Sequence, residues 1–128
     1  MIDKVKYWID LSDYDYDTAL AMLQSRRYLY VGFMCHQAIE KILKAYFNSK
    51  NDESAPYTHS LSYLAKKAKI YESLSEDFKD FLDLLEPLNI EARYPSHKEK
   101  LMKGLSENRC ESILQNTLKL QQWIKKKL

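Results

Sequence analysis

The chain is poor in the residues that build tight turns, with two glycines and three prolines in 128 residues. Folds made of many short strands need such residues at most of their connections, so their scarcity favours a few long helices. The length fits one compact domain over residues 1–128. Hydrophobic residues make up 45% of the chain, which is enough for a buried core. We therefore expect a single all-α domain.

A large excess of charge is also missing. The formal net charge is +2, which is too small to predict nonspecific binding of nucleic acid by the whole surface. Any such binding would need a local patch of cations. No apolar run reaches the roughly 18 residues of a membrane span, and the N-terminus lacks the apolar region of a signal peptide. These absences predict a cytoplasmic protein that has no membrane segment.

Cysteine is scarce as well, since only Cys35 and Cys110 are present. Both lie on apolar stripes of expected helices, which favours two buried free thiols in a reducing compartment over a disulfide. No group of cysteines and histidines has the spacing of a zinc site. A glycine-rich phosphate loop and a nucleophile elbow are both missing. The sequence predicts no metal and no cofactor.

Helical periodicity is what the sequence does contain. It predicts helices over residues 3–25, 28–49 and 60–69, a fourth that begins at 75 and can resume over 88–93, and a fifth that begins near 106 and closes at 125–127. Asp3 and Ser75 have the side chains of helix caps, and Pro87 should kink or interrupt the fourth helix. Residues 94–104 are expected to form a loop or a short turn of helix. Alternating tyrosines and aspartates at 13–17 fit the register of the first helix, with the aspartates in solvent.

The second expected helix has the widest apolar face, made of two adjacent stripes. The stripes are Val31, Cys35, Ala38, Ile42 and Ala45, and Gly32, His36, Ile39, Leu43 and Tyr46. So broad a face places this helix at the centre of an up-and-down four-helix bundle with one additional short helix. Polar residues lie along or beside that face, and such groups need partners within the protein or a ligand.

Three segments resemble the HEPN family, a group of small helical domains associated with nucleotides and RNA. They are CHQAIEKILKAYF at 35–47, HSLSYLAKKA at 59–68 and EARYPSH at 91–97. The resemblance covers nearly the whole chain. It implies a homodimer and a partner protein, a minimal nucleotidyltransferase, with which such proteins often form a toxin–antitoxin pair.

The third segment bears on catalysis. In ribonuclease members of the family, an arginine, four to six spacer residues and a histidine act together in a dimer cleft. The resemblance assigns these roles to Arg93 and His97. Histidine can transfer a proton near neutral pH, and the guanidinium fork of arginine can stabilise a phosphorane. Here the spacer has only three residues, and it includes Tyr94 and Pro95. The alternative is that Arg93 is structural or binds phosphate and that His97 is a solvated loop histidine.

Four residues are candidates for binding nucleotide or RNA: His36, Lys41, Lys44 and Tyr94. The two lysines lie one helical turn apart and could bind phosphate, and Tyr94 could stack on a base. Each has a structural alternative. His36 could bond to Gln37, Glu40 or a neighbouring helix, most helical lysines are simply solvated, and aromatic residues at helix ends are more often part of the core.

Three functions therefore stay open. The first is a toxin-like or accessory component of a HEPN and nucleotidyltransferase pair that binds nucleotide or RNA. The second is an active, metal-independent endoribonuclease that uses Arg93 and His97. The third is a noncatalytic helical scaffold or interaction module.

Overall fold

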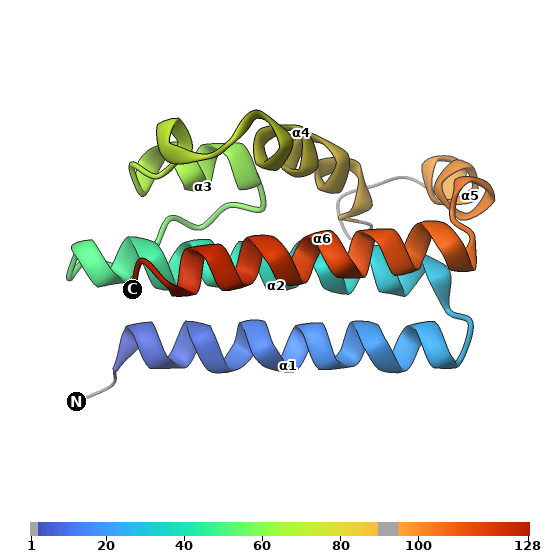
Figure 1. Ribbon diagram of the computed structural model, residues 1–128, viewed down its shortest axis with the longest axis horizontal. Helices are drawn as coiled ribbons and strands as arrows, with labels where there is room; N and C mark the ends of the chain where they lie inside the picture. The colour runs from blue at the N-terminus through green and yellow to red at the C-terminus, as the bar shows by residue number, and fades with distance from the viewer. Residues whose placement is uncertain (1–2, 90–94) are drawn as a thin grey trace.

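The computed structural model describes residues 3–89 and 95–128, except for the side chains of 95–98. In this part of the chain there are six α-helices, two 3-10 helices and no strand (Figure 1). The elements are α1 (Lys4–Gln24), α2 (Tyr28–Lys50), α3 (Leu61–Lys67), η1 (Tyr71–Ser73), α4 (Glu76–Leu85), η2 (Glu86–Leu88), α5 (Pro95–Gly104) and α6 (Glu107–Lys125). The expected all-α bundle is confirmed. None of the described helices has both the length and the apolarity that crossing a membrane requires.

Three long helices, α1, α2 and α6, lie side by side along the molecule (Figure 1). The short link after α1 makes α1 and α2 antiparallel neighbours. A second layer holds α3 and α4, and α5 lies at the end of the bundle where α1 turns into α2 (Figure 1). Helix α2 contacts all five of the other α-helices. It is therefore the central helix, as its sequence predicts.

Burial follows the two stripes of α2. Every member of both stripes is buried except Tyr46, which is half-buried. At Gly32, a Cβ atom would lie 3.1 Å from Cδ1 of Leu88. The absence of a side chain at this position therefore lets η2 pack closely against α2.

The helix ends show why the chain turns where it does. The side chain of Asp3 accepts a hydrogen bond from the Lys6 backbone N–H, and Ser75 accepts one from Phe78. Both expected caps are confirmed. Helix α4 ends at Leu85, and Pro87 falls within η2, which matches the expected interruption.

The expectation of a loop or a short turn of helix at 94–104 is wrong, because a helix of 10 residues, α5, occupies 95–104. Pro95 disfavours helix for the residue before it but is well suited to the first helical position, where no N–H is needed. The residues that follow it are mostly good helix formers such as lysine, leucine and methionine. Proline begins this helix rather than preventing it.

The expectation that all three aspartates of 13–17 face solvent is also wrong. Asp15 is buried, with 8% of its surface exposed, while Asp17 is exposed. Ser12, Asp15 and Ala19 are the buried residues of α1, and their spacing of three and four residues puts them on one face. Asp15 tolerates burial because Lys41 of α2 donates to its carboxylate at 2.7 Å.

Cys35 and Cys110 are buried and free, as expected. Burial raises the pKa of the Cys35 thiol to about 12 and that of the Cys110 thiol to about 11. Because the thiolate is the reactive species, a thiol reagent at pH 8 should label neither residue in the native protein and both after denaturation. Mass spectrometry of the labelled protein measures this, and rapid labelling of both native thiols would contradict it.

Ile42→Ala should lower the free energy of unfolding by about 2–5 kcal/mol, because it removes a buried aliphatic group and leaves a cavity. Ile42 has no exposed surface. Lys50→Ala, at the exposed end of the same helix, is the matched control and should change little. Urea unfolding of the two variants measures the difference, and equal midpoints would show that α2 is not the central element.

Candidate functional site

Exposed cationic side chains gather at one end of the bundle, around α5. We call this group the cationic end, and its members are Arg26, Arg27, Lys100, Lys103 and Arg109. They come from the α1–α2 link, from α5 and from the first turn of α6, which meet at the same end of the molecule (Figure 1). Residues 26–27 and 99–109 together hold these five cations and only two carboxylates. Exposed cations therefore outnumber carboxylates in these segments.

Two grooves flank α5. The smaller, of about 190 Å³, is lined by Arg26, Arg27, Tyr28, Leu29, Tyr30 and Met102. The larger, of about 330 Å³, has an aliphatic floor that includes Leu84, Leu88 and Leu101, with Lys100 and Arg109 among its lining residues. Cations beside an exposed tyrosine can hold phosphates while a base stacks on the ring. This end of the molecule is suited to a nucleotide or a single nucleic-acid strand.

The two residues expected to be catalytic, Arg93 and His97, come shortly before Lys100 and Leu101 in the sequence, and the latter two line the larger groove. His97 belongs to α5, although its side chain is not among those described. Arg93 and Tyr94 lie outside the described residues. The pairing of Arg93 with His97, and base stacking by Tyr94, therefore stay predictions.

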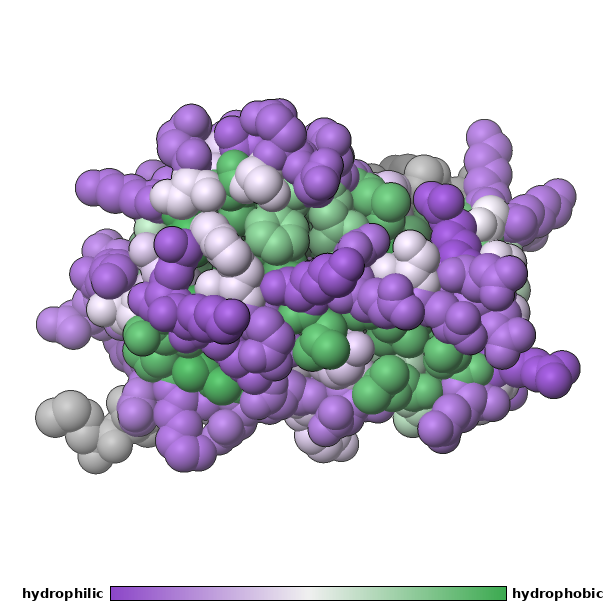
Figure 2. All heavy atoms as spheres, viewed as in Figure 1, coloured by the Kyte–Doolittle hydropathy of each residue, from purple (hydrophilic) through white to green (hydrophobic). Residues whose placement is uncertain are grey.

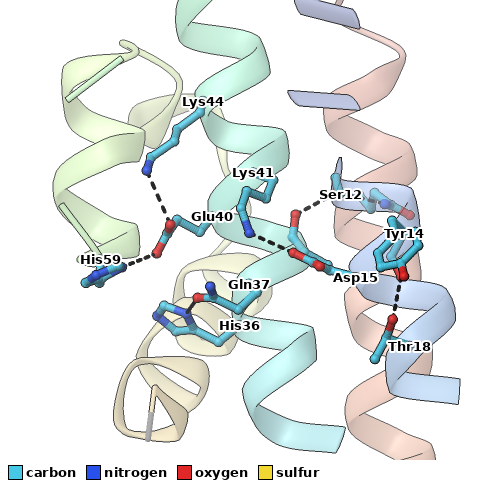
Figure 3. Close-up of polar contacts among 12 residues, drawn as sticks. Ser12, Tyr14, Asp15, Thr18, His36, Gln37, Glu40, Lys41, Lys44 and His59 are labelled. Atoms are coloured by element: carbon cyan, nitrogen blue, oxygen red, sulfur yellow. Dashed lines mark hydrogen bonds and ion pairs between the residues drawn. The ribbon is translucent and has the colours of Figure 1, made fainter. Parts of the chain in front are cut away.

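A cluster of polar side chains lies inside the bundle, where α2 meets the start of α3. The carboxylate of Glu40, which is 2% exposed, contacts His59 Nδ1 at 2.9 Å and Lys44 Nζ at 3.3 Å (Figure 3). Lys44 Nζ also lies 5.2 Å from the centre of the Trp8 ring. Glu40 thus joins the start of α3 to α2, and its buried charge is compensated.

Both candidate lysines of α2 have carboxylate partners. Lys44 pairs with Glu40, and Lys41 pairs with Asp15 across the contact between α1 and α2 (Figure 3). Their side chains are 9% and 16% exposed, respectively. A phosphate would have to displace a carboxylate to reach either ammonium group. Phosphate binding by Lys41 and Lys44 stays a prediction, and their observed role is to neutralise buried acids.

His36 is fully buried, and its Nδ1 lies 3.3 Å from Oε1 of Gln37 (Figure 3). Burial lowers the pKa of His36 below its ordinary value of 6.5, although the charge of Glu40 acts in the opposite direction. The imidazole is therefore neutral at pH 7. A ligand at His36 stays a prediction, and the contact with Gln37 matches the structural alternative.

Sequence reasoning missed the cationic end because its members are far apart in the chain. The adjacent arginines at 26–27 were a visible signal, but they also fit the end of a helix, where cations favour the dipole. Lys100 and Lys103 fall in the segment that the sequence predicts to be a loop or a short turn of helix. Recognising that 95–104 is a helix would have placed both lysines on one face beside the start of α6.

Acidification should destabilise the protein through His36. Below pH 6.5 the unfolded chain binds a proton that the folded protein binds only at lower pH, so the free energy of unfolding falls as pH falls through this window. Urea midpoints at pH 7.5 and 5.5 measure the slope. His36→Gln should reduce it, and Gln24→Ala, an exposed control at the end of α1, should not. An unchanged slope in His36→Gln would contradict the assignment.

Comparison with known proteins agrees with this fold. The family model described as HEPN domain matches residues 5–128. The crystal structure of TT1696 from Thermus thermophilus superposes with a TM-score of 0.83 at 19% sequence identity, and the match covers 99% of this chain and 100% of that one. At that identity the likeness shows the fold alone. No curated protein gives a significant match. Because the family model spans almost the full length, the chain belongs to the HEPN family.

Proposed function

We propose that this HEPN protein binds RNA or a nucleotide at the cationic end and acts as a toxin-like or accessory component beside a minimal nucleotidyltransferase. The observation that carries the binding role is the cationic end itself, where five exposed cations lie on or near the helix that contains His97. The nucleotidyltransferase partner and a homodimeric state are proposed from family membership.

The chemistry of this end favours a phosphate-bearing ligand. The net charge of the whole chain is only +2, yet the cations at 26–27 and 99–109 outnumber the carboxylates by five to two. In contrast to Lys41 and Lys44, the members of the cationic end are exposed. Exposed cations release counterions when they meet a phosphate backbone, which drives binding and makes it depend on salt.

The double variant Lys100→Ala with Arg109→Ala should bind a fluorescent single-stranded RNA more weakly than the wild type, because two cations are removed. Fluorescence anisotropy measures the affinity. Each lost phosphate contact should reduce the slope of log affinity against log salt concentration by about 0.7. The matched control is Lys66→Ala with Lys67→Ala, two exposed lysines on α3. Equal loss in the two double variants would show that the cationic end is not the binding surface.

A catalytic role is the second candidate, favoured by the position of His97 on α5 beside the cationic end. In metal-independent cleavage the ribose 2′-oxygen attacks phosphorus, its proton passes to a base, and the 5′-oxygen leaves with a proton from an acid. Purified protein should then cleave RNA in EDTA and leave a 2′,3′-cyclic phosphate. Arg93→Ala and His97→Ala should each abolish cleavage.

The outcomes separate the candidate functions. RNA binding without cleavage supports the accessory role, and EDTA-resistant cleavage that depends on both residues supports the endoribonuclease. Cleavage that requires Mg²⁺ would contradict the Arg93 and His97 mechanism. Absence of both binding and cleavage would leave the helical scaffold, and a gene for a minimal nucleotidyltransferase beside this one would support the paired system.

A further inference from the structure

A pocket of about 380 Å³ opens at the end of the bundle opposite α5, where α1 begins and α2 ends (Figure 1). Its walls come from the start of α1, the last turn of α2 and the link that follows α2. The lining residues are Lys4, Tyr7, Trp8, Asn48, Ser54 and Ala55. Pockets of this size commonly bind small molecules. None of these residues belongs to the cationic end, so the pocket is a separate feature.

Two aromatic rings form one corner of the pocket. The ring centroids of Tyr7 and Trp8 lie 5.0 Å apart, and the two planes are inclined by 75°. Tyr7 is 51% exposed, while Trp8 packs partly against the core. Hydrophobic side chains are visible at the surface near the start of α1 in Figure 2, so this end exposes apolar surface besides the two rings. A planar ligand that stacks on one ring meets the other ring at its edge, which is a favourable arrangement of aromatic groups.

Hydrogen bonds between the link after α2 and both helices fix the walls of the pocket. Asn48 Oδ1 accepts from Trp8 Nε1 at 3.1 Å. Asn48 Nδ2 donates to the backbone carbonyls of Asn51 and Glu53 at 3.2 and 2.7 Å. Lys4 Nζ donates to another backbone carbonyl of this link at 2.5 Å. The pocket is therefore formed before a ligand arrives, which lowers the entropic cost of binding.

The charges at the pocket favour a ligand with a single negative charge. Lys4 is exposed and bonds to a carbonyl, and no described carboxylate forms an ion pair with it. The Ser54 hydroxyl has no hydrogen-bond partner in the described part of the chain and can donate to an anion. Asp52 and Glu53, next to Ser54 in the sequence, are exposed and would repel a ligand with several negative charges. One ammonium group and one hydroxyl suit one carboxylate better than a chain of phosphates.

We propose that this pocket binds a small planar aromatic monocarboxylate. The ring of the ligand stacks in the corner made by Tyr7 and Trp8, and its carboxylate accepts hydrogen bonds from Lys4 and Ser54. The hydrogen bond to an ammonium group is charge-assisted and therefore among the stronger ones. The pocket and the cationic end lie at opposite ends of the bundle, so a ligand here leaves the proposed RNA surface free.

Isothermal titration calorimetry of the full chain with naphthoate, an aromatic monocarboxylate, tests this site. Lys4→Gln and Tyr7→Ala should each weaken naphthoate binding roughly tenfold, because one removes a charged donor and the other removes a ring wall. Naphthalenemethanol, which keeps the ring and lacks the charge, should bind the wild type roughly tenfold more weakly. The matched controls are Lys6→Gln and Tyr14→Ala, exposed positions of α1 outside the pocket, which should leave the affinity unchanged.

Fluorescence locates the ligand independently. The chain has two tryptophans, so a Trp123→Phe variant reports on Trp8 alone, and naphthoate should quench its emission with the affinity that calorimetry gives.

Four results would overturn the inference. They are no naphthoate binding at millimolar concentration, equal affinity for naphthalenemethanol, tighter binding of ADP than of naphthoate in the pocket, and equal losses in the pocket and control variants. Circular dichroism confirms that each variant is folded, and the exposed Lys4→Gln change tests the site even if Tyr7→Ala is unstable. RNA anisotropy on the same variants should not change, so failure of this pocket is distinguishable from failure of the cationic end.

Discussion

The rest of the structure depends on the burial of α2 by helices on every side. Its two apolar stripes are wider than a surface helix needs, and α1, α6, α3, α4 and α5 all contact it. Removing so much apolar surface from water is the main stabilising term in a domain of this size. It also sets a constraint, because each polar group on α2 must be compensated within the protein.

The polar contacts of α2 follow from that constraint. Lys41 is paired with Asp15 of α1, and Glu40 is paired with Lys44 and with His59 at the start of α3. The hydroxyl of Ser12 donates to the Ala38 carbonyl at 2.7 Å and accepts from Gln121 of α6 at 2.9 Å. The Glu40–Lys44 pair lies within α2. The contacts with Asp15, His59, Ser12 and Gln121 join α2 to other segments, so they specify the packing of α1, the start of α3 and α6 as well as satisfying buried groups.

Glu40, Lys41 and Lys44 have partners inside the protein, whereas Nε2 of His36 is buried with no hydrogen-bond partner among the described residues. The exposed charges lie elsewhere. The exposed cations concentrate at the α5 end. The position of η2, held closely against α2 at Gly32, brings α4 and the start of α6 to the two sides of the larger groove beside α5. The end of the bundle near α5 is therefore where the binding role is proposed.

The helical class could be predicted from the sequence alone, as could the central place of α2, the caps at Asp3 and Ser75 and the burial of both cysteines. Each of these depends on local periodicity or on a side chain bonding its own helix, so each can be predicted within one segment. The pairing of polar residues from different helices could not be predicted in this way, because it depends on how the helices pack. Asp15 looked solvated because its burial depends on Lys41, 26 residues away. Arg26 and Lys100 share one end of the bundle only because α5 is a helix that lies beside the α1–α2 link, and periodicity within a segment carries no information about such distant neighbours.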